Sequence, residues 1–307
     1  MYNSKKDRPL VSVVMNCYNC DKFLMDAIDS VYAQTYDNWE IIFWDNSSTD
    51  SSADIANSYD NRLKYFQSKV TTKLGLARNQ AISRVNGKYV TFLDCDDLHL
   101  PDKIEKQVTL MEENSCTMCY GSAYIINTNG EIVDRRKTKN KSGLIFGNLL
   151  RHYEINMQSV MILQSVFSSG QFSFSSELSF SPDYDLFMRI SSKYHTCVIP
   201  DFIVKHRDWG GSLSYKSHNI AALENKFTLD FLLHNSKDLK VKYHKEFIEA
   251  YNKLNYYEAI ACLYDNDKKN ALLRIKDIVF TKPVYLIFYI ILLSPISSKN
   301  ILRLVKN

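Results

Sequence analysis

Apolar runs alternate with helical patterns through the first third of the chain. The run Leu10–Met15 is rich in β-branched residues and ends at polar residues, which is typical of a strand that leads into a loop. From Asp21 to Gln34 the apolar residues recur at the spacing of a helix, and Trp39–Trp44 is a second apolar run that ends at Asp45. This order predicts a strand, a helix and a second strand.

The same alternation continues into a segment rich in aspartate. Leu63–Phe66 is a predicted third strand, Leu74–Ile82 a predicted helix and Tyr89–Leu93 a predicted fourth strand. Strands that alternate with helices predict an α/β fold with a mostly parallel sheet flanked by helices. Because ligands bind at the carboxyl ends of parallel strands, we expect Asn16, Asp45 and the carboxylates after the fourth strand to meet in one crevice.

The fourth predicted strand ends in three carboxylates, Asp94, Asp96 and Asp97. Clustered carboxylates are costly unless a cation neutralises them, and their hard oxygen atoms suit Mg²⁺ or Mn²⁺ bound together with substrate phosphates. A metal site is therefore the favoured interpretation. The alternative is a solvated turn, because Asp is also an ordinary turn residue.

Composition and known motifs exclude several classes of function. The net charge of +4 is mild and is not gathered in a basic arm, so nucleic acid is not an expected partner. Neither a Gly-x-Gly-x-x-Gly fingerprint nor a Gly-Lys-Ser/Thr loop occurs, which argues against nicotinamide enzymes and P-loop ATPases. Residues 1–9 are polar and lack the apolar core of a signal peptide, so a cytoplasmic location is expected.

The chain has seven cysteines, which in the cytoplasm are expected to be reduced. They include two Cys-x-x-Cys pairs, Cys17 with Cys20 and Cys116 with Cys119. The pairs are far more widely separated than the ligands of a usual zinc ribbon, and no His lies close to them. Structural zinc is therefore an alternative that the sequence does not favour.

Five motifs carry a resemblance to a known family. They are Ser12–Asn19, Asp45–Asp50, Gly75–Asn79, Phe92–Asp97 and Ser181–Arg189. In this order and at these separations, the set resembles the family 2 glycosyltransferases of the GT-A fold. The resemblance implies a Rossmann-like GT-A domain over residues 1–215, with a nucleotide-binding half at about 1–100 and an acceptor half at about 101–215.

The resemblance also implies roles for individual residues. Those that it places at the donor nucleotide are Asn16, Tyr18, Asp45, Arg78 and Asp94. Asp94 and Asp96 match the family's Asp-x-Asp, with Asp96 as the more direct ligand of a Mn²⁺ or Mg²⁺ ion. Two alternatives stay open, namely that Asp45 caps a helix and that Arg78 is a surface residue.

Asp183 matches the catalytic base of the family. Such a base takes the proton from the acceptor hydroxyl while that oxygen attacks the anomeric carbon, and one carboxylate suffices for a single inverting displacement. The chain departs from the family at Pro182, where Glu is usual. Asp185 is the competing candidate for the base.

A second departure from the family follows Lys205. When the chain is aligned on Arg207, Trp209 stands where the family often has a His. His206 is then the candidate third metal ligand, because imidazole is an acceptable ligand for Mn²⁺. The alternative is that His206 has only a structural role.

Residues 216–307 are predicted to form a helical extension. Helices are predicted over Ile220–His234, Tyr243–Tyr264 and Lys268–Val279, and the most apolar stretch of the chain lies within 283–296. This stretch is too short to cross a bilayer. Its basic flanks favour a segment that lies on the inner leaflet of a membrane, and a buried C-terminal helix is the alternative.

The leading hypothesis is a metal-dependent, inverting glycosyltransferase of the hexosyl or N-acetylhexosaminyl class. Its donor would be a nucleotide-diphosphate sugar, with UDP as the expected nucleotide, and its acceptor a glycan or lipid-linked precursor of a surface polysaccharide. One alternative is a sugar nucleotidyltransferase, although Asn16–Asn19 is not the Gly-rich triphosphate loop that such an enzyme needs. The other is a glycan-binding protein on a decayed transferase fold, for which Pro182 and Trp209 are the hints.

Overall fold

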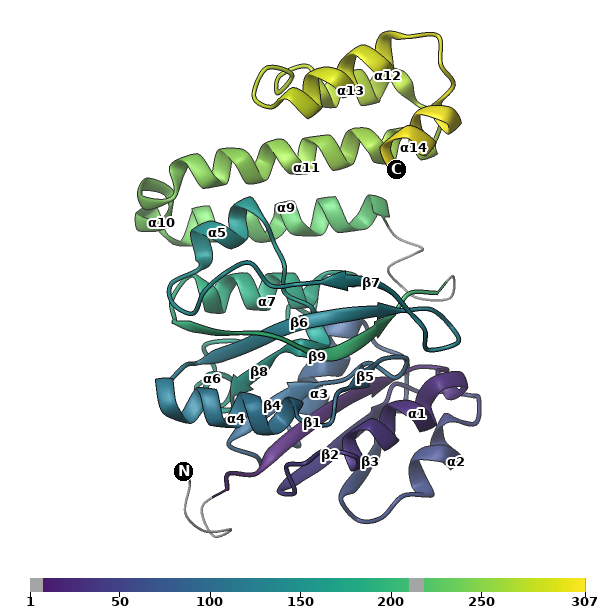
Figure 1. Ribbon diagram of the computed structural model, residues 1–307, viewed down its shortest axis with the longest axis vertical. Helices are drawn as coiled ribbons and strands as arrows, with labels where there is room; N and C mark the ends of the chain where they lie inside the picture. The colour runs from purple at the N-terminus through teal and green to yellow at the C-terminus, as the bar shows by residue number, and fades with distance from the viewer. Residues whose placement is uncertain (1–7, 210–217, 307) are drawn as a thin grey trace. The chain divides into compact units, whose positions relative to one another are not determined.

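The computed structural model describes residues 8–209 and 218–306 (Figure 1). The chain divides into two compact units, Met1–Ser212 and Leu213–Asn307. The first contains the sheet and the second is helical in its described part.

The amino-terminal part of the first unit has the predicted alternation of strands and helices. Its elements are β1 (Val11–Cys17), α1 (Asp21–Tyr32), β2 (Trp39–Asp45), α2 (Ser52–Asn57), β3 (Leu63–Gln67), α3 (Leu74–Ile82) and β4 (Tyr89–Phe92). Strand β1 pairs in parallel with β2 and with β4, and β2 pairs in parallel with β3. The prediction of a parallel α/β sheet is therefore confirmed for these four strands.

The rest of the first unit adds further strands and helices. They are β5 (Leu98–His99), α4 (Lys103–Asn114), β6 (Met118–Ile126), β7 (Ile132–Arg136), α5 (Phe146–Arg151), the 3₁₀-helix η2 (Met157–Ser159), β8 (Met161–Leu163), α6 (Ser165–Ser168), α7 (Pro182–Ser191) and β9 (Thr196–Arg207). Among the described residues, nine strands form one sheet in the order β3-β2-β1-β4-β8-β6-β9-β5, with β7 paired to β6. Strand β8 is antiparallel to β4 and β6, whereas β6 is parallel to β9, so this side of the sheet is mixed.

Helix α1 illustrates how the apolar pattern produces the core. The five side chains that it buries are those that its helical spacing marks in the sequence, Phe23, Leu24, Ala27, Ile28 and Val31. They join the apolar residues of β1, β2 and β4 in one cluster. Burial of each large apolar side chain contributes about 1.5–3 kcal/mol, so the cluster anchors the strands whose ends carry the polar motifs.

Gly75 lets helix α3 approach the segment that precedes α7. A Cβ at this position would lie 2.0 Å from the carbonyl oxygen of Ser175, which is far too close for any side chain. Asn79, one turn further along α3, donates to the carbonyl of Phe174 and accepts from its amide, at 2.8 and 2.9 Å. Together they fix the start of α7, and with it Asp183, against α3.

The cysteines differ from the sequence expectation in one respect. Cys116 and Cys197, whose Cα atoms are 5.9 Å apart, are joined as a disulfide, although all seven cysteines were expected to be reduced. The two residues lie on adjacent chain segments because β6 and β9 run side by side, and this pairing cannot be read from the spacing of the cysteines.

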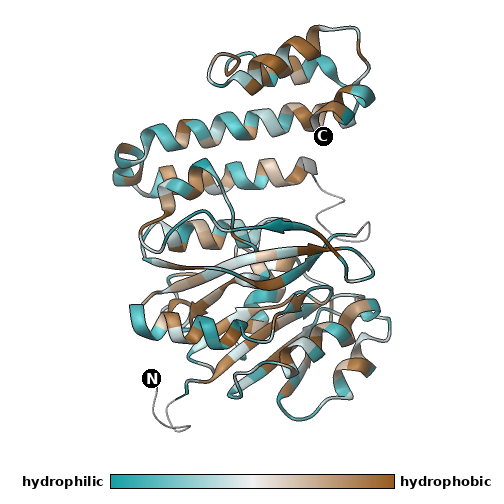
Figure 2. Cartoon of the chain, viewed as in Figure 1, coloured by the Kyte–Doolittle hydropathy of each residue, from teal (hydrophilic) through white to brown (hydrophobic). Residues whose placement is uncertain are grey.

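The second unit is helical in the part that the structure describes. Its helices are α9 (His218–Asn235), α10 (Lys237–Lys242), α11 (His244–Tyr264), α12 (Lys268–Ile275), α13 (Pro283–Leu293) and α14 (Ser298–Lys306). Figure 2 shows α13 as strongly apolar. Tyr285, Phe288 and Leu292 of this helix are buried in the unit's own core, whereas Ile287 and Ile290 are exposed. None of the described helices is long and apolar enough to cross a membrane.

Candidate active site

The carboxyl ends of the parallel strands meet at one edge of the sheet, as expected. Cys17 at the end of β1 pairs with Asp45 at the end of β2. The amide of Leu93, just after β4, donates to the carbonyl of Val14 in β1 at 3.0 Å. Hence the loops that begin after Asn16, Asp45 and Leu93 start beside one another.

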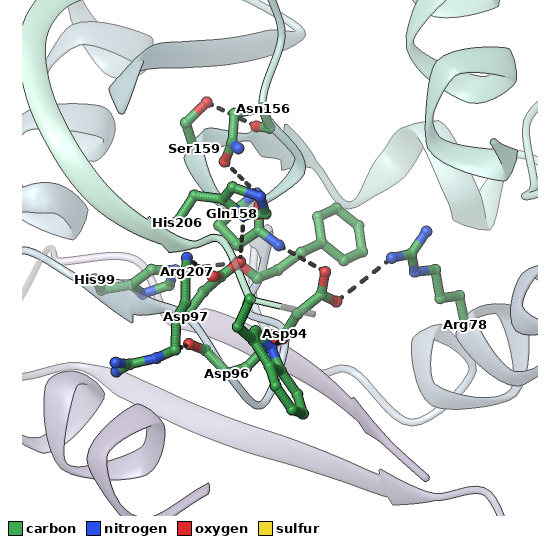
Figure 3. A network of polar contacts seen from close by, with 12 residues as sticks. Arg78, Asp94, Asp96, Asp97, His99, Asn156, Gln158, Ser159, His206 and Arg207 are labelled. Carbon is green, nitrogen blue, oxygen red and sulfur yellow. Dashed lines mark hydrogen bonds and ion pairs between the residues drawn. The ribbon is translucent and has the colours of Figure 1, made fainter. Parts of the chain in front are cut away.

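Asp94 is held by two side chains from other parts of the chain (Figure 3). Its Oδ1 lies 3.4 Å from Nη2 of Arg78, and its Oδ2 accepts a hydrogen bond from Nε2 of Gln158 at 2.6 Å. The Arg78 side chain is 5% exposed, so it is not the surface residue of the alternative interpretation. Asp94 itself is 37% exposed and remains open to a ligand.

Asp183 lies in the first turn of α7 on the other side of Arg78. Its Oδ1 is 3.9 Å from Nη1 of Arg78. Burial raises the pKa of Asp183, the Arg78 guanidinium partly opposes that shift, and the nearby charge of Asp94 adds to it. The structure therefore brings together Arg78, Asp94 and Asp183, three of the residues that the resemblance assigned to the site.

Asp185 has different surroundings from Asp183. It is 2% exposed, and its Oδ2 accepts from Nε and Nη2 of Arg189 at 2.9 and 2.6 Å. This ion pair lies within α7, four residues apart along the helix. A carboxylate bound in this way by its own helix has little capacity left for an acceptor hydroxyl.

Asp96 lies next to an indole instead of an imidazole. Its Oδ2 accepts a hydrogen bond from Nε1 of Trp209 at 2.8 Å, and the Trp209 ring packs edge-on against Phe23. Burial and, after it, the charge of Asp94 raise the pKa of Asp96. A cation placed at these two carboxylates would relieve their repulsion.

Asp97 is fully buried and joins the carboxylate loop to β9. Its Oδ1 accepts from the amide of Arg207 at 2.6 Å, and its Oδ2 lies 3.0 Å from Nδ1 of His206. Burial raises the pKa of Asp97 to about 6. For His206, burial lowers the pKa, but the Asp97 carboxylate outweighs it and raises the pKa overall.

The residues near Asp96 fit a divalent cation in their chemistry. Within the described residues, no group of three or more His, Cys, Asp or Glu side chains is already arranged to hold a metal ion. Asp94 and Asp96 nevertheless offer hard oxygen atoms. His206 also contacts a carboxylate through Nδ1, which is the arrangement that directs Nε2 of a histidine toward a metal.

Two other predicted donor-site residues, Asp45 and Tyr18, differ in burial and in hydrogen bonding. Asp45 is fully buried, and its two oxygens accept from the amide of Ser48 and the hydroxyl of Tyr65 at 2.7 and 2.6 Å. The amide of Ser48 lies before α2, which begins at Ser52, so Asp45 does not cap this helix as the alternative had it, and its contact with a nucleotide stays a prediction. Tyr18 is 52% exposed in the loop after β1.

The sequence analysis did not identify Gln158, which donates to Asp94. Gln158 lies on η2, where no periodicity or motif marks it, and it is 64 residues from its partner in the chain. For Trp209 a signal did exist, because the alignment on Arg207 placed it where a metal-binding His would stand. Its contact with Asp96, however, joins residues 113 positions apart.

Comparison with known proteins is consistent with this geometry. Residues 12–178 match the family model described as glycosyl transferase family 2. The chain belongs to this family. The matched region includes Arg78 and the carboxylate loop, while α7 with Asp183 lies beyond it.

Two relatives illustrate the range of this glycosyltransferase family. An uncharacterized glycosyltransferase of Rickettsia felis is 33% identical over 211 residues, which cover 68% of this chain and 35% of the relative. The chain thus spans about a third of that protein's length. The Escherichia coli protein named UDP-Glc:alpha-D-GlcNAc-diphosphoundecaprenol beta-1,3-glucosyltransferase WfgD is 31% identical over 169 residues, which cover 55% of this chain and 66% of WfgD.

A solved structure identifies the fold. The mannosyltransferase PcManGT from Pyrobaculum calidifontis, in complex with GDP-Man and Mn²⁺, superimposes with a TM-score of 0.61 at 15% identity. The superposition covers 89% of this chain and 76% of that one. The fold of this family 2 member is accordingly GT-A, with C-terminal helices, as the resemblance implied.

Proposed function

We propose that this chain is a metal-dependent, inverting glycosyltransferase that transfers a sugar from a nucleotide-diphosphate donor, with UDP as the nucleotide. The acceptor is a glycan or lipid-linked precursor of a surface polysaccharide, such as the lipid-linked acceptor in the name of WfgD. Residues 1–215 form the catalytic domain, with the donor bound by about the first 100 and the acceptor by the remainder.

The observation that carries this proposal is a pair of buried donors without acceptors beside a cluster of carboxylates. In the described part of the chain, Nδ2 of Asn16 and Nη1 of Arg78 are buried and have no hydrogen-bond partner. An unmet buried donor costs about 1–3 kcal/mol, so each such group needs an explanation, and a bound ligand that supplies the acceptor is one. A diphosphate supplies oxygen acceptors for these donors, and its cation suits Asp94 and Asp96.

The residues around Arg78 divide the chemistry between them. Asp183 accepts the proton of the acceptor hydroxyl as that oxygen forms its bond to the anomeric carbon. The bond from this carbon to the diphosphate breaks on the opposite face, so the configuration inverts. The raised pKa of Asp183 suits proton acceptance, and Arg78 orients its carboxylate while also facing Asp94.

Asp96 and Asp94 would hold the Mn²⁺ or Mg²⁺ ion, with His206 as the candidate third ligand. When bound, the ion neutralises negative charge that develops on the departing diphosphate. Asp97 fixes the tautomer and orientation of His206 through Nδ1. The indole of Trp209 restrains one oxygen of Asp96 and leaves the other available to a ligand.

A screen of nucleotide sugars tests this proposal. The chain should release nucleoside diphosphate from a UDP-sugar in the presence of Mn²⁺, and chelation of the metal should remove the activity. The Arg78→Met variant is the comparison in which this release should be lost. It keeps the length of the side chain but cannot contact Asp94 or Asp183 through a guanidinium. Release that is unaffected by chelation would contradict the metal dependence, and absence of nucleotide binding would contradict the donor site.

We further propose that the second unit contacts the cytoplasmic face of a membrane, close to a lipid-linked acceptor. The support is the two-sided character of α13. Its buried face already forms a core, so the apolar residues of the other face are free for a second environment. These exposed residues are Val284 at 48%, Ile287 at 57%, Ile290 at 58% and Leu293 at 61%. An apolar face flanked by basic residues fits the boundary of an anionic leaflet.

Sedimentation with anionic liposomes tests this contact. Ile290→Glu should reduce the bound fraction, because it places a charge on the exposed face of α13. Val241→Glu is the matched control, since Val241 is 81% exposed on α10 and belongs to no such face. Equal binding of both variants and the unchanged protein would contradict the membrane contact.

A further inference from the structure

Three cysteines lie in the loops of the candidate active site or at their ends. Cys17 is the last residue of β1, Cys20 precedes the first residue of α1, and Cys95 stands between Asp94 and Asp96. Cys17 and Cys95 are buried, whereas Cys20 is partly exposed. The chain thus brings together thiols that are up to 78 positions apart by residue number (95 − 17 = 78).

Each of the three thiols shifts the pKa of the other two, chiefly through hydrogen bonding among their side chains. Further contacts hold the group in place, because Cys95 Sγ donates to the carbonyl of Asn16 at 3.4 Å and Cys17 Sγ lies 3.8 Å from Oγ of Ser48. Within the described residues, no group of three or more His, Cys, Asp or Glu side chains is arranged to hold a metal ion.

The local fold around Cys17 and Cys20 is the one in which thiols undergo redox chemistry. A Cys-x-x-Cys segment that links a strand to the start of a helix inside a β-α-β unit is typical of thiol–disulfide sites. The hydrogen bonds from Cys20 and Cys95 lower the pKa of Cys17, and the bond to Cys17 raises the pKa of Cys20. The pair therefore holds one thiolate and shares one proton.

We infer that Cys17 and Cys20 form a reversible disulfide when the protein meets a peroxide, and that this disulfide weakens donor binding. The part of the inference that concerns donor binding rests on the proposed function. The partly exposed sulfur of Cys20 is where the oxidant enters, and the Cys17 sulfur is its partner in the new bond.

The chemistry balances with a peroxide as the oxidant. The proton shared between the two sulfurs passes to Cys17, which leaves Cys20 as the thiolate. This thiolate attacks one peroxide oxygen, the O–O bond breaks, and Cys20 becomes a sulfenic acid while the other oxygen leaves as hydroxide. The Cys17 sulfur then attacks the Cys20 sulfur, the S–S bond forms, and the hydroxide that leaves Cys20 combines with the Cys17 proton to give one water.

The loop that such a bond would distort supports the donor site. Asn19, which has a φ of 53°, accepts a hydrogen bond from the amide of Thr49 at 2.8 Å and donates its own amide to Ser48 at 3.0 Å. The carbonyl of Cys17 accepts from the amide of Asn46 at 2.8 Å. Drawing the two sulfurs together changes the backbone that makes these contacts, and with it the positions of Asn16 and Asp45.

Peroxide treatment followed by peptide mass mapping tests the inference. The full chain should yield a peptide pair joined through Cys17 and Cys20 with the loss of two hydrogen atoms, and dithiothreitol should separate them. The affinity for UDP with Mn²⁺, measured by calorimetry, should fall at least tenfold after oxidation and recover on reduction. Bound UDP should in turn slow the formation of the disulfide, because linkage is reciprocal.

Matched variants make the test decisive. Cys20→Ser keeps the size of the side chain and can cap α1, so it should bind UDP as before and keep that affinity after peroxide. Cys262→Ser, in the second unit, should behave like the unchanged protein. The inference fails if no peptide joined through Cys17 forms, or if Cys20→Ser loses UDP affinity on oxidation as the unchanged protein does. If the reduced protein binds no UDP, the proposed function fails, and the peptide map alone decides whether the disulfide forms.

Discussion

Asp94 and Asp97 are identical side chains three positions apart, yet their surroundings differ (Figure 3). Asp94 is 37% exposed and contacts two side chains, Arg78 and Gln158. Asp97 is fully buried, and its oxygens are engaged by the amide of Arg207 and the imidazole of His206. The first carboxylate can exchange its partners for a ligand, whereas the second holds the loop against β9.

This difference separates two kinds of aspartate within one motif. A carboxylate that satisfies a buried backbone amide is part of the fold, because its removal leaves that donor unpaired. A carboxylate that faces Arg78 together with Asp183 belongs to a polar site in which, among the described residues, Asn16 Nδ2 and Arg78 Nη1 are buried donors without a hydrogen-bond partner. The variants below test whether chemistry and stability divide along this line.

The largest effect is expected for Asp183→Asn. The amide keeps the size of the side chain but cannot accept the acceptor proton, so turnover should fall roughly 10²–10⁴-fold. UDP affinity should change little, which calorimetry can check alongside steady-state rates. Asp185→Asn is the matched control on the same helix. A loss of turnover in the control, with normal activity of Asp183→Asn, would assign the base to the other residue.

Asp96→Ala should abolish the part of UDP binding that depends on Mn²⁺. The reason is that Asp96 offers the site one carboxylate oxygen, while its other oxygen accepts a hydrogen bond from Trp209. The melting temperature should stay within a few degrees of the unchanged protein, at about 2–4 °C for each kcal/mol. Titration of UDP with and without Mn²⁺ checks this prediction, and unchanged metal-dependent affinity would refute the assignment of Asp96.

The sequence allowed the fold and the place of Asp94 to be predicted, but not the role of Asp97. Strand and helix patterns are local, so the parallel strands β1 to β4 and the edge that carries Asp94 followed from spacing alone. The role of Asp97 did not, because it depends on a contact with Arg207 that spans 110 positions. Gln158 was missed for the same reason, since its partner is set by how η2 packs and not by its neighbours in the chain.

Asp97→Asn should reduce stability more than it reduces nucleotide affinity. An amide can accept from the Arg207 backbone through its oxygen, but its nitrogen then meets Nδ1 of His206 with a second donor when the ring is protonated there. The expected loss is about 1–3 kcal/mol in the free energy of unfolding. Chemical denaturation measures it, with Asp96→Asn as the control. A stable Asp97→Asn variant would mean that Asp97, like Asp94, is not needed to hold the loop against β9, and would contradict the contrast between these two residues.

The smallest effect concerns Lys103, a fully buried lysine of α4 whose side chain contacts β4, the strand before Asp94. Its Nζ donates to Thr91 and to Gln107, and Gln107 in turn donates to the carbonyl of Ser159 beside Gln158. Burial lowers the pKa of Lys103 to about 7. In the unfolded chain a lysine titrates near 10.4, so between pH 7 and about 10 the unfolded state binds more protons.

Stability should therefore rise with pH across this window, since deprotonation removes the cost of burying the charge. Lys103→Met abolishes this contribution, so the difference in unfolding free energy between variant and unchanged protein should shift by on the order of 3 kcal/mol from pH 7 to pH 10. Denaturation at several pH values measures the shift. Lys106→Met, on the exposed side of α4, is the control and should show no such rise. A difference that is constant with pH would mean that Lys103 stays charged in the fold, held by Thr91 and Gln107 without a neutral amine.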